Sequence, residues 1–126
     1  MRLLLLACLG GAVGSGARHL VNITAARMMG IAFPWGTLTV NLLGCFLMGV
    51  VIEALALKYQ GSLELRTLIA TGFLGGFTTF SAFSLDVVSL MEKGETAVAV
   101  GYAAVSVGAS IVALVAGLTV TRLILA

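Results

Sequence analysis

Long apolar runs separated by short polar connections set the pattern of this chain. Four runs contain no charged residue: 3–17, 28–52, 67–85 and 96–121. A helix needs about 20 mainly apolar residues to cross the hydrocarbon core of a membrane, and the first run resumes after Arg18 and continues to Ala26. The pattern therefore predicts one transmembrane domain, residues 1–126, with four helices at roughly 3–26, 35–57, 67–91 and 96–122.

Composition agrees with a membrane protein and excludes other classes. Hydrophobic residues make up 60% of the 126 residues and charged residues 10%, with a mean hydropathy of +1.17. Soluble domains usually carry roughly 25% charged residues. The seven basic residues are scattered, so no nucleic-acid-binding surface is indicated. Cys8 and Cys45 lie inside apolar runs, where we expect small buried side chains and neither a disulfide nor a metal site.

The first eight residues resemble the cleavage box of a bacterial lipoprotein, because Arg2 and a leucine run precede Cys8. The apolar segment before Cys8 is, however, shorter than that of a usual signal peptide. Cleavage there would also remove the first half of the first predicted helix. We therefore expect this segment to remain part of the membrane domain.

Basic residues are divided almost evenly between the two sides of the predicted domain. Four spans place Arg2, Lys58, Arg66 and Arg122 on one side, and Arg18, Arg27 and Lys93 on the other. Because Lys and Arg near helix ends set the orientation of membrane proteins, this small difference predicts a weakly specified topology and permits an antiparallel homodimer. A dimer is also expected because four helices leave no room for an aqueous path within one bundle.

Small residues four positions apart predict close contacts between helices. They are Gly10 and Gly14, Gly72 and Gly76, and Ala109, Ala113 and Gly117. This spacing lets helix backbones approach each other in lipid. It indicates packing and carries no information about transport.

Polar residues in the middle of the second and fourth spans are informative because polar groups are costly in hydrocarbon and usually face a bundle interior or a pathway. Thr37 and Asn41 share one helix face, and Tyr102, Ser106 and Ser110 form a stripe on another. Each of them could instead hydrogen-bond to a neighbouring helix. Together, the two stripes favour a polar track.

The chemistry of this track favours an anion. No carboxylate occupies a clear mid-membrane position, whereas the track offers hydroxyl and amide donors and the positive edges of aromatic rings. Arg18, near the end of the first span, either attracts anions into a vestibule or extends its side chain to the membrane interface.

The third span contains the most unusual segment, TGFLGGFTTFSAFS at residues 71–84. Gly75-Gly76 followed by Thr78-Thr79 disfavours a helix, which predicts a local break at mid-membrane depth. Non-helical backbone survives there only if it is buried in protein or bound to something, and freed carbonyl oxygens are suitable ligands for a hard cation. An unbroken helix with a glycine-lined packing face is the alternative.

Three segments resemble the Fluc, or CrcB, family of bacterial fluoride channels: GGFTTFSAFS at 75–84, WGTLTVNLLG at 35–44 and GGAVGSGAR at 10–18. The resemblance extends over essentially the whole chain, and its third-span motif is the specific one. It implies an all-α membrane protein with a broken third helix, assembled as an antiparallel, dual-topology homodimer in the bacterial inner membrane. The implied function is passive, fluoride-selective export through two pores per dimer, without enzymatic activity.

The resemblance also implies site residues. The family's pore phenylalanines match Phe80 and Phe83, and its pore asparagine matches Asn41. The other pore positions implied are Thr37, Ser84, Tyr102, Ser106 and Ser110, with Arg18 at the vestibule. A structural sodium ion at the dimer centre would be held by the backbone carbonyls of Gly75 and Thr78 from both copies.

Two other interpretations belong to different classes. A proton-coupled small multidrug carrier shares the length, the four spans and dual insertion, but it needs a carboxylate in the first span, and residues 3–26 contain none. A structural or assembly subunit without transport activity is the second alternative. Fluoride flux from liposomes distinguishes all three.

Overall fold

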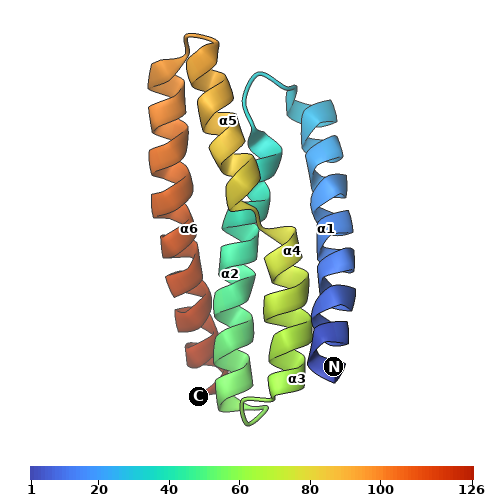
Figure 1. The fold of residues 1–126 in the computed structure, drawn as a ribbon. Coiled ribbons are helices and arrows are strands. Elements are labelled where there is room, and N and C mark those ends of the chain that lie inside the picture. The colour runs from blue at the N-terminus through green and yellow to red at the C-terminus, as the bar shows by residue number, and fades with distance from the viewer.

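The computed structural model describes residues 1–126 as a bundle of four long helical segments (Figure 1). Three of them are continuous: α1 (Arg2–Met29), α2 (Trp35–Leu57) and α6 (Thr96–Leu125). The third segment consists of α3 (Leu63–Leu65), the π-helix η1 (Arg66–Leu74), α4 (Gly75–Phe77) and α5 (Phe80–Glu92). All four segments are long and apolar enough to cross a membrane. The prediction of an all-helical protein with four helices able to span a membrane is confirmed.

Neighbouring helices in the bundle are not always neighbours in sequence. Both termini and the α2–α3 connection lie at one end of the bundle (Figure 1). α6 packs mainly along α2, and α1 packs mainly against η1 and α4. The third segment therefore changes partner along its length, because its later part, α5, packs against α6.

The third helix is broken at Thr78 and Thr79, in agreement with the predicted break. Both residues are extended, with ψ of 159° at Thr78 and φ of −153° at Thr79. The Thr79 hydroxyl accepts a hydrogen bond from the N–H of Ala82 at 3.1 Å and so caps the start of α5. The glycine pair, Gly75-Gly76, stays helical. The β-branched threonines, which suit extended backbone, are therefore where the helix ends.

Glycines bring the helix backbones together, as the small-residue spacing predicted. A Cβ atom on Gly10 would clash with the carbonyl oxygen of Leu68, and one on Gly14 would clash with that of Phe73. On the other side of the bundle, Gly117 of α6 lies directly against the carbonyl oxygen of Phe46 on α2. These contacts fix η1 against α1 and α6 against α2.

We expect Gly117→Ala to destabilise the protein by about 1–3 kcal/mol, the usual cost of overpacking. The new Cβ would meet the Phe46 carbonyl oxygen, a backbone atom that cannot rotate away. Gly108→Ala is the matched control on the same helix, because a Cβ there meets nothing within 4 Å. Thermal unfolding in detergent should show a lower midpoint for Gly117→Ala only, and equal midpoints would contradict the close packing.

Candidate functional site

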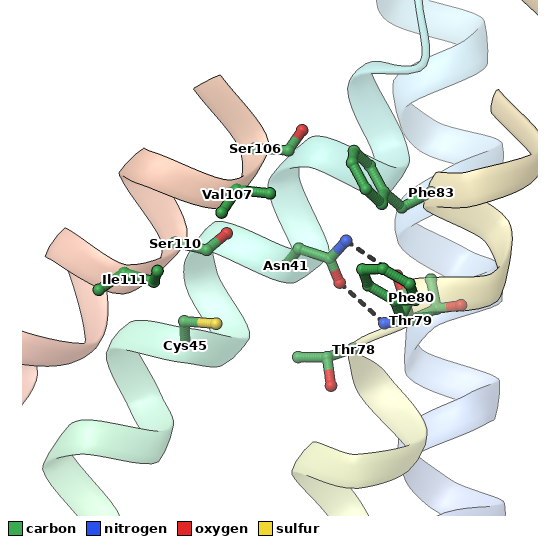
Figure 2. Close-up of a pocket in the computed structure, with 10 residues that line it drawn as sticks. All are labelled: Asn41, Cys45, Thr78, Thr79, Phe80, Phe83, Ser106, Val107, Ser110 and Ile111. Atoms are coloured by element: carbon green, nitrogen blue, oxygen red, sulfur yellow. Dashed lines mark hydrogen bonds between the residues drawn. The ribbon is translucent and has the colours of Figure 1, made fainter. Parts of the chain in front are cut away.

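A cavity of about 300 Å³ lies beside the helix break, between α2, α5 and α6 (Figure 2). Five of the predicted pore residues line it: Asn41, Phe80, Phe83, Ser106 and Ser110. The rest of the lining consists of Cys45, Thr78, Thr79, Val107 and Ile111. Residues that are distant in sequence therefore meet at one place, where a few polar groups face an otherwise apolar wall.

The side chain of Asn41 connects α2 to the break. Its Nδ2 donates to the carbonyl oxygen of Thr79 at 3.0 Å, and its Oδ1 accepts from the N–H of Thr79 at 2.8 Å, as the dashed lines in Figure 2 show. Buried backbone groups need partners, and this carboxamide supplies both for Thr79. Asn41 thus holds the extended segment against α2, and one of its two N–H groups remains for the cavity.

Ser106 and Ser110, one turn apart on α6, place two hydroxyls on the cavity wall (Figure 2). Both oxygen atoms are buried and have no hydrogen-bond partner in the chain. Leaving a buried polar group unsatisfied costs about 1–3 kcal/mol, and native proteins rarely do so without a reason. A small polar species in the cavity would satisfy both hydroxyls.

Phe80 and Phe83 form a tilted pair, with ring centroids 5.5 Å apart and an interplanar angle of 50°. Phe83 is buried and also contacts the ring of Tyr102, whereas the Phe80 side chain is 76% exposed in the single chain. Ring edges carry partial positive charge. The pair can therefore present ring edges to an anion in the cavity. Because Phe80 is exposed and is the first residue of α5, its position is set by the helix break and not by a packed core.

Three predicted pore residues do not line this cavity. Tyr102 is only 2% exposed, and its hydroxyl donates to a carboxylate oxygen of Asp86 at 3.0 Å. Thr37 lines a separate cavity of about 210 Å³, whose wall also includes Asp86. The Ser84 hydroxyl donates to the carbonyl oxygen of Phe80, one turn earlier in its own helix, at 2.9 Å. The proton of Ser84 is therefore not free for a ligand.

Arg18 lines a second cavity, of about 500 Å³, that also reaches Thr79. The other residues of its wall are Ser15, His19, Asn22, Ser81, Ala82 and Leu85. No carboxylate is among them, and Arg18 makes no ion pair. Because opposite charge is attracted into such a cleft, this second cavity is suited to an anion.

The break also changes the surroundings of the Gly75 and Thr78 carbonyl oxygens. In a continuous helix they would accept from the N–H groups of Thr79 and Ala82. Those groups donate instead to Asn41 Oδ1 and Thr79 Oγ1. Backbone oxygens released in this way are the donor type that a hard cation prefers, so both fit the predicted sodium ligands.

Some cavity residues were missed in the sequence. Cys45 follows Asn41 by one helical turn, so the i, i+4 spacing would have placed it on the same face. Ser15, His19 and Asn22 were missed, although they share one face of α1 with the predicted Arg18 at i, i+3, i+4, i+7 spacing. The role of Thr79 was signalled only by its place at a helix start, where threonine is a common cap.

Comparison with known proteins places this chain in a family. The family profile described as CrcB-like protein, Camphor Resistance (CrcB), matches residues 5–118. A protein of Rhizobium johnstonii named fluoride-specific ion channel FluC is 57% identical over 118 residues, which are 94% of each chain. Its namesake in a Chelativorans species is 57% identical over 122 residues, 97% of this chain and 98% of the relative. That of Agrobacterium fabrum is 49% identical over 113 residues, 90% of each chain.

Proposed function

We infer from the membership of this chain in the CrcB-like family that it is a passive, fluoride-selective channel, which exports fluoride across the bacterial inner membrane. The family is one of fluoride channels and not of enzymes. The observation that carries the proposal for this chain is the pair of buried hydroxyls without partners, on Ser106 and Ser110, beside the rings of Phe80 and Phe83.

The proposed mechanism replaces the water around fluoride with donors from the protein. The Ser106 and Ser110 hydroxyls and the remaining N–H of Asn41 donate to the ion, while the ring edges of Phe80 and Phe83 contact its partly dehydrated surface. The mainly apolar wall limits how much water accompanies the ion. Flow follows the electrochemical gradient, and size together with the strength of the donors sets selectivity.

An antiparallel homodimer with one pore per chain, two in all, completes this proposal. It is supported by the open rim of the cavity, where Phe80 is 76% exposed in a single chain. Cross-linking in liposomes at low protein density should trap dimers, and one chain per conducting unit would contradict this arrangement. Arg18 is proposed to gather anions at a vestibule. Thr37 and Tyr102 are proposed to extend the track beyond the cavity by position only, because the Tyr102 hydroxyl donates to Asp86 and Asp86 also lines the Thr37 cavity.

The proposed structural sodium ion would be held by the Gly75 and Thr78 carbonyl oxygens of both copies. Its support is the pair of carbonyl oxygens that the break deprives of their usual helical donors. A ligand that binds only the folded state stabilises it. Thermal unfolding should therefore occur at higher temperature in sodium than in choline, and equal midpoints in both would remove this ion from the proposal.

Purified protein in liposomes loaded with fluoride tests the function directly. We expect fluoride to leave down its gradient without coupling to protons, with much slower flux of chloride under the same conditions. Flux that requires a proton gradient would support the carrier alternative. The absence of fluoride flux from correctly folded dimers would support the alternative of a structural subunit.

We expect the double variant Ser106→Ala, Ser110→Ala to reduce fluoride flux by about tenfold or more, since each lost hydrogen bond is worth about 1 kcal/mol and more towards a charged group. Its stability should not fall, because neither hydroxyl has a partner within the chain. Thr119→Ala is the control, because that hydroxyl bonds its own helix at Val115. Flux equal to that of the parent in the double variant would contradict the proposed donors.

A further inference from the structure

We propose that Cys45 is a thiol modification site inside the cavity, and that small neutral thiol-directed electrophiles react there and block the passage. The block rests on the proposed channel function, whereas the modification itself does not. Modification of Cys45 should affect the channel because the thiol and the proposed ion ligands line the same cavity.

The geometry places this thiol among the polar groups of the cavity. Cys45 lies on α2 one turn after Asn41 and shares the wall with Thr78 and Ser110 (Figure 2). It is a free cysteine of intermediate exposure, and Cys8 is exposed, so the expectation that both side chains are buried in the chain is wrong. An independent sign that the cavity accepts small molecules is Ser106, which is only 5% exposed and has a hydroxyl without a partner.

Reactivity should distinguish the two cysteines of the chain. The thiolate is the nucleophilic form of cysteine, and thiolate formation needs a polar, hydrated surrounding because a charge is costly in an apolar medium. Cys45 is near the middle of α2, at membrane depth, so it meets water only through the cavity. Cys8 is exposed on the surface of α1 and lines neither the cavity beside the helix break nor the cavity at Arg18. We infer that Cys8 faces lipid and that Cys45 is the reactive thiol.

An alkyl methanethiosulfonate is a suitable probe, because it is neutral and enters apolar spaces. The Cys45 thiolate attacks the alkyl-bearing sulfur, a new S–S bond forms, and the bond from that sulfur to the sulfonyl group breaks. Methanesulfinate leaves, and the thiol proton passes to water. The alkylthio group then stands in the cavity close to Asn41 and Ser110.

The experiment treats the protein in liposomes with the methyl and the benzyl reagent and uses two measurements. Mass spectrometry reports which cysteine is modified, and a fluoride electrode reports flux relative to the untreated flux of each variant. We expect Cys45 to be labelled and Cys8 to stay free. Flux should fall to about a tenth with the benzyl group, since a filled constriction stops conduction, should fall less with the methyl group, and should recover with dithiothreitol.

Two variants serve as controls. Cys45→Ala should be insensitive to both reagents, and Cys8→Ala should be blocked like the parent. An unlabelled Cys45, or equal block of Cys45→Ala, would overturn the proposal while leaving the channel function intact. If the untreated protein carries no fluoride, the proposed function fails, and labelling of Cys45 in preference to Cys8 still supports the thiol site.

Discussion

Phe80→Ile is expected to abolish fluoride flux while the chain still folds. Phe80 is 76% exposed in the single chain, and its ring lines the cavity. Substitutions of exposed residues usually change the stability of a chain by less than about 0.5 kcal/mol, so the fold of the single chain should be kept, and dimer content is measured separately. Isoleucine keeps an apolar side chain but has no ring edge with partial positive charge. The loss should therefore lie in conduction rather than in folding.

The control for this variant is Val88→Ile on the same helix. Val88 is 51% exposed and does not line the cavity. Fluoride efflux from liposomes and dimer content should be measured on both variants. Val88→Ile should behave like the parent, and Phe80→Ile should show background efflux with normal dimer content. Parental efflux in Phe80→Ile would remove the ring from the mechanism.

Asn41→Asp is expected to reduce fluoride flux about as strongly as Phe80→Ile, for a different reason. In its ionised form the introduced carboxylate can still accept from the N–H of Thr79, but it has no hydrogen to donate to the Thr79 carbonyl oxygen, so the effect should grow as the pH rises. The unsatisfied carbonyl costs about 1–3 kcal/mol. The ionised carboxylate would also repel fluoride. Two like charges roughly 4 Å apart repel by about 4 kcal/mol at an effective dielectric constant near 20. We therefore expect fluoride flux to fall by about a thousandfold or more.

Asn41→Leu separates the two contributions, because it removes both hydrogen bonds without adding charge. It should lower the unfolding temperature more than Asn41→Asp does, since two backbone groups of Thr79 lose their partner. Thr39→Ala is the control on α2, because the Thr39 hydroxyl bonds its own helix at Trp35. Parental flux in Asn41→Asp would show that anions do not pass close to this side chain.

Local pattern determined the larger features of the protein. Uncharged runs of sufficient length predicted four spans, because the thickness of a bilayer fixes the length of a helix that crosses it. The glycine and threonine motif predicted the break, and the periodicity of a helix placed Ser106 and Ser110 on one face. These properties depend on residues close together in sequence, and the resemblance to a channel family rested on the same short segments.

Tertiary structure decided the partner of each polar group. The resemblance predicts that Asn41 donates to the ion, yet half of its hydrogen-bonding capacity is used on Thr79, 38 positions later in the chain. Ser84 was assigned to the pore, yet its hydroxyl bonds its own helix at Phe80.

The sequence does not give these partners because helical periodicity shows which residues share a face but not which residues of another helix that face contacts. A hydrogen bond needs two atoms within about 3 Å and correctly oriented, and packing between helices sets those distances. The sequence by itself therefore determined which residues are candidates for the site. Only the packing of α2, α5 and α6 around the break decided which of them face the cavity with an unused donor.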